Sequence, residues 1–149
     1  MTLETAFSAA NLVALLGWIG LLLAPLARTR LVAGARIVGF GLCLAYAATL
    51  ALAITHPQAG GASGGGFGSL AAVAILFSNK GALLAGWIHY LAFDLWTGAW
   101  ETEDAARAGV PHWLLLPCLV LTFMLGPVGL GLYLIIRTAY RGRAIVEVA

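Results

Sequence analysis

Two ionisable side chains lie within an apolar segment of the sequence, where a charge is energetically unfavourable. His89 and Asp94 both belong to the segment 81–100. Ionisable groups in such segments normally face the interior of a helix bundle or a wet cavity, so each is a candidate functional residue. Carboxyl and imidazole groups are also the usual groups for proton transfer. General acid–base chemistry is therefore the first function that this segment indicates.

Helical geometry decides which of these groups can meet. At about 100° per residue, Asp94 shares a helix face with residues four or seven positions away. That face also carries Trp87, Tyr90 and Glu101. His89 lies about 140° round the helix from Asp94, and its own stripe includes Trp96. We therefore expect no direct contact between His89 and Asp94 within this helix.

A second histidine is predicted near the acidic end of this helix. His112 precedes the last apolar segment, and the short connection from Glu101 makes the two helices neighbours. Asp94, Glu101 and His112 could converge at the mouth of one pocket. Three interpretations stay open: an acid–base site for a lipid-dissolved substrate, a metal site built from these ligands, and hydrogen bonds that only tie helix ends together. No close metal-binding spacing supports the second, and the sequence does not identify a cofactor.

The residues near His89, Asp94 and His112 could either bind a ligand or have a purely structural role. Asn79 and Lys80 could cap the third apolar helix and line the entrance to a site, although Lys80 could equally extend to the membrane interface. Trp87 and Trp96 could line an apolar ligand site or simply pack in the core. The polar residues after this helix are expected in a solvated loop: Glu103, Asp104 and Arg107.

The composition requires a membrane to hold these elements. Apolar residues make up 62% of the 149-residue chain and charged residues only 9%, with a mean hydropathy of +0.97. Soluble domains carry about a quarter charged residues. The eight basic residues mostly flank apolar runs, which is typical of membrane flanks and not of nucleic-acid binding. We predict an all-α integral membrane four-helix bundle, a single domain of residues 1–149, with spans at 7–27, 37–55, 81–100 and 113–136.

The connections between the spans differ in character. The glycine-rich stretch 58–68 is incompatible with a stable helix and is predicted as a flexible loop. Residues 69–77 are apolar but too short to cross, so a short interfacial or re-entrant helix is expected before the third span. Four spans would place both termini on one side of the membrane. The basic residues then divide evenly between the two sides, which leaves the orientation open.

Several stretches in the second half of the chain resemble a known family. They are FSNK at 77–80, WIHYLAFDL at 87–95, GAW at 98–100, GVPH at 109–112, PCL at 117–119 and FMLGPVG at 123–129. This order and spacing is similar to the plant abscisic-acid-deficient-four family, small membrane proteins required for neoxanthin formation in plastids, with many bacterial relatives. The resemblance covers about residues 77–137, and the first two spans match only in hydropathy.

The resemblance implies a role in carotenoid (xanthophyll) metabolism. In the plant pathway violaxanthin is isomerised to neoxanthin: an epoxide opens and an allene forms without net redox change. Such a step needs an acid at the epoxide oxygen and a base for a carbon-bound proton. On this hypothesis the catalytic residues are His89, Asp94 and His112. The substrate-binding residues are Asn79, Lys80, Trp87, Tyr90, Trp96 and Glu101.

The resemblance and the start of the chain together predict the location and the partners of the protein. The chain begins almost directly with its first span and has no plastid-type leader, so we expect the bacterial inner (cytoplasmic) membrane. Expected partners are a lipid-soluble isoprenoid such as a carotenoid, membrane lipid, and a second copy of the chain or other pathway enzymes. Two further functions stay open, a carotenoid- or lipid-binding scaffold without catalysis and a small transporter or channel.

Overall fold

The protein is all-α in the residues that the structure describes. The computed structural model describes residues 2–55 and 64–148, with side chains up to Tyr140. The helices are α1 (Leu3–Leu22), α2 (Ala24–Thr55), α3 (Leu70–Ser78), α4 (Lys80–Ala108), α5 (His112–Leu125) and α6 (Pro127–Val148). The predicted helical class and the short helix before the third span are confirmed. Residues 58–63 of the predicted glycine-rich loop lie outside the described ranges, and 64–69 contain no helix.

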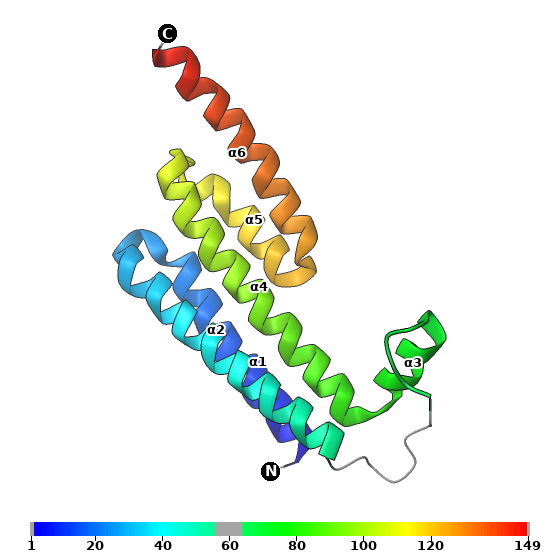
Figure 1. The fold of residues 1–149 in the computed structure, drawn as a ribbon. Coiled ribbons are helices and arrows are strands. Elements are labelled where there is room, and N and C mark those ends of the chain that lie inside the picture. Colours follow the sequence, from blue (N-terminus) through cyan, green and yellow to red (C-terminus); the bar gives the residue numbers. More distant parts are fainter. Residues whose placement is uncertain (1, 56–63, 149) are drawn as a thin grey trace.

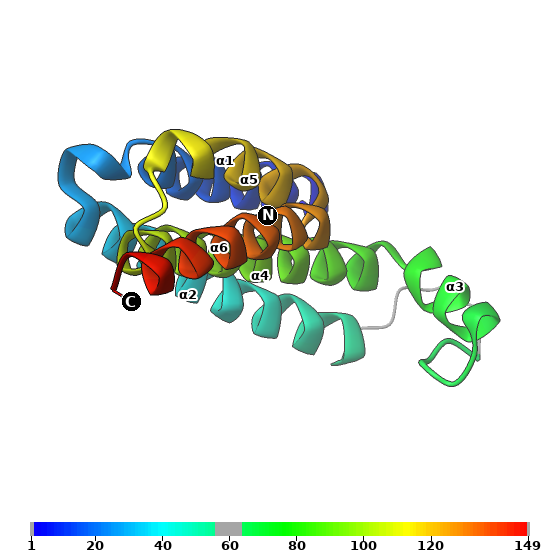
Figure 2. The ribbon, with the colours of Figure 1, turned by 90° about the horizontal axis from the view of Figure 1, so that it is seen from above.

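Helix α4 is the central element of the fold. It contacts each of the other five helices. Figure 1 shows α1 and α2 on one side of α4 and the α5–α6 pair on the other, and Figure 2, from above, shows α1 beside α5 with α2 on the opposite side of α4. Close packing against α1 uses glycines: a Cβ added at Gly98 would lie 2.6 Å from the Trp18 ring, and one at Gly17 would lie 2.7 Å from Leu95. The residues of α4 are therefore distributed over several different interfaces.

The first helices have the length and surface of membrane spans. Both α1, with 20 residues, and α2, with 32, are apolar enough to cross a bilayer, and 20 helical residues cover about 30 Å. The pair α3–α4, bent by 104° at Asn79, passes the same test as one span. Large apolar side chains such as Leu12, Ile37 and Phe40 are exposed, as expected when lipid covers the exterior. The predicted connection after residue 27 is itself helical, because α2 begins at Ala24 and only bends at Ala27.

The predicted fourth span, 113–136, differs from the structure, which has two helices there. Gly126 breaks the chain with φ 46° and ψ −94°, and Pro127 starts α6. The 14 residues of α5 cover about 21 Å, less than the ~30 Å apolar core of a bilayer. Helix α6 then packs back along α5 (Figure 1). A tight α5–α6 hairpin therefore replaces the single span, and a four-helix bundle is not what the structure shows.

The hairpin reaches only half-way along α4. A Cβ at Gly126 would lie 2.8 Å from Oδ1 of Asp94, the central residue of α4. The turn therefore lies at mid-depth, while the start of α5 and the end of α6 lie at the end of the stack where α4 finishes. Figure 1 accordingly shows the two ends of the chain at opposite ends of the molecule. The expectation that both termini share a side does not hold for this arrangement.

Candidate functional site

The start of α4 is fixed by a side-chain cap. Asn79 Oδ1 accepts hydrogen bonds from the backbone N–H groups of Gly81 at 2.8 Å and Ala82 at 3.2 Å, which satisfies donors that a helix N-terminus leaves open. Lys80 follows as an exposed residue and lines a 320 Å³ cavity between α1 and α4. Asn79 thus has a structural role in the cap, and Lys80 lies at the mouth of this cavity.

A row of aromatic rings leads from that cavity toward the middle of α4. Phe7 and Trp87 both line the cavity, and their ring centroids are 5.7 Å apart. Trp87 is also 5.5 Å from the Tyr90 ring, and its indole N–H donates to Asn11 Oδ1 at 3.2 Å. The Tyr90 hydroxyl donates to the Phe123 carbonyl at 3.2 Å, just before the hairpin turn. The row therefore connects the α1–α4 cavity with the tip of the α5–α6 hairpin.

Asp94 lies where this row meets the hairpin turn. Its side chain, one turn beyond Tyr90, is half-buried against Gly126. Its Oδ2 atom is buried and makes no hydrogen bond. An unpaired polar oxygen inside a protein is unfavourable by about 1–3 kcal/mol. The site is therefore suited to a hydrogen-bond donor brought by a ligand.

His89 does not join Asp94. It is exposed on another side of α4, where it stacks on Phe93 with centroids 4.5 Å apart and meets Tyr46 of α2 at 5.3 Å. Trp96 also lies toward α2, with the Arg36 guanidinium 5.8 Å from its ring centroid. The expected separation of His89 from Asp94 is what the structure shows, so these two residues do not form an acid–base pair.

The predicted pocket mouth of Asp94, Glu101 and His112 is not assembled. The His112 Nε2–H group donates to the Leu22 carbonyl at 3.0 Å and ties α5 to the end of α1. Glu101 is fully buried and accepts from the Thr122 hydroxyl at 3.0 and 3.1 Å, between α4 and α5. Within the described residues, no group of three or more His, Cys, Asp or Glu side chains could hold a metal. Glu101 and His112 are thus inter-helix contacts at other places.

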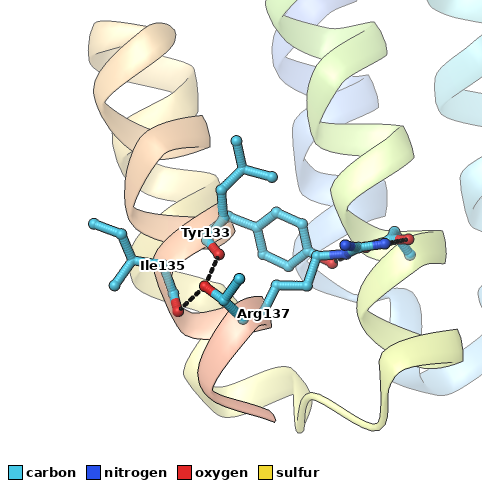
Figure 3. A network of polar contacts seen from close by, with 6 residues as sticks. Tyr133, Ile135 and Arg137 are labelled. Carbon is cyan, nitrogen blue, oxygen red and sulfur yellow. Dashed lines mark hydrogen bonds and ion pairs between the residues drawn. The ribbon is translucent and has the colours of Figure 1, made fainter. Parts of the chain in front are cut away.

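One polar network was missed at the sequence level. Asp104, expected in a solvated loop, is buried within α4. It accepts from the Tyr133 hydroxyl at 2.5 Å and forms an ion pair with Arg137, whose second N–H donates at 2.9 Å. Figure 3 shows Tyr133 and Arg137 extending from α6 toward α4, while Ile135 points away. The i, i+4 spacing of Tyr133 and Arg137 places both side chains on one face of the helix. The sequence alone does not show that this face packs against α4.

One of three comparisons with known proteins found a match. Residues 5–133 match a family model described as ABA DEFICIENT 4-like. The match includes α1 and α2, which the sequence motifs alone did not reach. No curated protein and no solved structure matches the chain.

Proposed function

Because the chain belongs to the ABA DEFICIENT 4-like family, we propose that this helical membrane protein binds a carotenoid or a related oxygenated isoprenoid between α1 and α4. The observation that carries the proposal is Asp94, whose buried Oδ2 has no hydrogen-bond partner at the end of an aromatic row. A hydroxyl group of the ligand can donate to the half-buried carboxylate, and an epoxide can accept from the protonated carboxyl group.

The apolar part of the ligand would lie along the aromatic row. Phe7 and Trp87 present their rings at the cavity between α1 and α4, and 40% of Trp87 is exposed. This surface faces the bilayer, so a lipid-dissolved polyene or isoprenoid chain can reach it without passing through water. The oxygenated end of the ligand would then lie beside Tyr90 and Asp94.

Asp94 also supplies a chemistry that fits an isomerisation. Its protonated carboxyl group gives a proton to the epoxide oxygen as the C–O bond breaks and the oxygen keeps the electron pair. The carboxylate then takes the carbon-bound proton, and the released C–H electron pair forms the new double bond of the allene. Asp94 returns to its starting state, and no electrons leave the substrate. On this proposal one carboxyl group serves as both acid and base, and His89, which stacks on Phe93 on another side of α4, takes no part in the step.

The test is pigment binding and conversion in one host. The chain is expressed in a bacterium engineered to make epoxidised xanthophylls and is purified in mild detergent. We expect co-purified pigment with a shifted absorbance spectrum, and an isomerised product among the extracted pigments. Trp87→Ala should remove most of the bound pigment, whereas Phe40→Ala, an exposed aromatic residue on α2, should retain it. Colourless protein at normal yield would refute the binding proposal.

Asp94→Asn separates binding from catalysis. The amide keeps the shape of the side chain but has no proton to transfer, so we expect bound pigment and loss of the isomerised product. A second function, a non-catalytic pigment-binding scaffold, is favoured because Asp94 lies beside Tyr90 while the other carboxyl group of the site, Glu4, lines the cavity at the opposite end of the row. It predicts bound pigment and no new product for both the native chain and Asp94→Asn. Product formation by Asp94→Asn would exclude Asp94 as the acid–base group.

A further inference from the structure

The arginines of the chain gather at one end of the helix stack. Arg28 and Arg30 lie at the start of α2, and Arg107 lies in the last turn of α4. The hairpin brings Arg137 to the same end, where it pairs with Asp104. Arg141 and Arg143 follow on α6, and Arg36 completes the set of seven. The basic residues that a four-span topology divides evenly are thus on one side, and only Lys80 is on the other.

The uneven distribution of basic residues predicts which membrane leaflet surrounds the arginine-bearing end. Lys and Arg near span ends are retained on the cytoplasmic side, and acidic residues contribute little to this rule. The cytoplasmic leaflet also carries anionic phospholipids that attract basic residues close to the membrane. The arginine-bearing end therefore faces phosphate-rich headgroups.

A cavity at this end is lined by three of the arginines. Its volume is 490 Å³, and it lies between the start of α2 and the end of α4. Arg28, Arg36 and Arg107 line it together with Glu103. Its remaining lining includes Val32, Ile37 and Ala106, which are apolar. The cavity thus combines a cationic rim with an apolar wall.

The charges inside the cavity are not balanced. The Glu103 carboxylate accepts from Arg36 at 2.7 Å and is 3.4 Å from Arg107. One negative group against three positive groups leaves an excess of two positive charges. The Nε atom of Arg36 is also buried and makes no hydrogen bond. An anion with several acceptor oxygens would supply the missing negative charge and would accept from the exposed guanidinium group of Arg107.

We propose that this cavity binds a phosphate group, most simply that of an anionic phospholipid headgroup. Arginine donors match phosphate oxygens in geometry and charge. The site is independent of the proposed carotenoid site, since Asp94 lies at mid-depth and the α1–α4 cavity lies at the opposite end of α4. Free phosphate carries the same chemistry but cannot use the apolar wall.

The test uses the full chain in a neutral detergent and counts bound lipid by native mass spectrometry. The probes are phosphatidylglycerol, phosphatidylcholine as the zwitterionic control, whose phosphate is balanced by a choline cation, and inorganic phosphate as the lipid-free source. We expect phosphatidylglycerol to bind more tightly than phosphatidylcholine. Since one basic residue near an anionic surface contributes about 1 kcal/mol, Arg28→Gln or Arg107→Gln should each weaken binding about fivefold.

Two matched variants make the result specific. Arg30→Gln removes a charge from the same end without touching the cavity lining, so its effect should stay below about twofold. Glu103→Gln removes the only acid of the lining and should strengthen binding. Competition by millimolar inorganic phosphate identifies the phosphate group itself as the ligand, and its failure to compete assigns binding to the whole lipid. Equal losses for Arg28→Gln and Arg30→Gln, or no preference over phosphatidylcholine, would overturn the proposal.

Discussion

Gly129 tests whether α5 and α6 form a hairpin. It faces the backbone of α5, so a Cβ at this position would overlap the Thr122 amide nitrogen and lie 2.6 Å from the Cys118 carbonyl oxygen. Gly131, two residues further along α6, has nothing within 4 Å of such an atom. The variants Gly129→Ala and Gly131→Ala therefore add the same methyl group to the same helix in opposite surroundings.

The expected magnitudes follow from these contacts. Replacing Gly by Ala inside a helix favours the helix by up to about 1 kcal/mol, and this is all that Gly131→Ala should do. At Gly129 the atoms that must move are backbone, so the overpacking penalty should reach the upper end of its usual range, about 3 kcal/mol. Subtracting the helix preference leaves Gly129→Ala destabilised by roughly 2 kcal/mol. The two variants should then differ by about 3 kcal/mol.

The measurement is equilibrium unfolding of the purified chain in mixed micelles, with circular dichroism as the signal. The free energy of unfolding is compared for the native chain and the two variants. If residues 113–136 formed one continuous span, both glycines would lie in one helix without this close partner, and both variants would behave alike. Equal free energies of unfolding for Gly129→Ala and Gly131→Ala would therefore refute the hairpin.

Two further predictions follow from the same architecture. Asp104→Asn should lower the free energy of unfolding by about 3 kcal/mol, which is the low end for breaking a buried ion pair, because 20% of the Arg137 side chain is exposed. Adding Arg137→Gln to this variant should lower the free energy of unfolding little further. A loss below about 1 kcal/mol for Asp104→Asn would indicate a solvated pair. The second prediction is that the C-terminus is cytoplasmic and the N-terminus is on the opposite side of the membrane. In a bacterial host, a C-terminal fluorescent-protein fusion should therefore fluoresce, and a C-terminal alkaline phosphatase fusion should be inactive. An N-terminal epitope should be cleaved by protease added to intact spheroplasts. Both termini reporting the same side would contradict an arrangement in which α1, α2 and the α3–α4 pair cross the membrane and the α5–α6 hairpin does not.

The sequence predicted the helices better than their connections. Composition and apolar runs were sufficient for the all-α membrane class, for α1 and for the apolar part of α4, because these depend on local hydrophobicity, but not for the polar last turns of α4 up to Ala108. The turn at Gly126 was not predicted, because glycine and proline inside an apolar run are also typical of a kinked membrane helix. What selects the reversal is the close packing of Gly129 on α5, which only a three-dimensional arrangement reveals.

The site was predicted in part. The shared face of Trp87, Tyr90 and Asp94 followed from helical spacing, and these residues do lie along one row. The burial of Glu101 and Asp104 did not follow, because the sequence predicted Glu101 at a pocket mouth and Asp104 in a solvated loop. Their partners come from α5 and α6, which are far away in the sequence.

The α5–α6 hairpin also has a consequence for how the protein is assembled. Between His112 and Arg137 the chain contains no Asp, Glu, Lys or Arg, so the tip at Gly126 can enter the bilayer without carrying a charge through it. The hairpin can therefore insert from the arginine-bearing side after α4 is in place, with no segment translocated to the far side. Its docking is the event that covers Glu101 and Asp104. In this order of insertion, the last step would both close the polar interior of the protein and position the turn at Asp94.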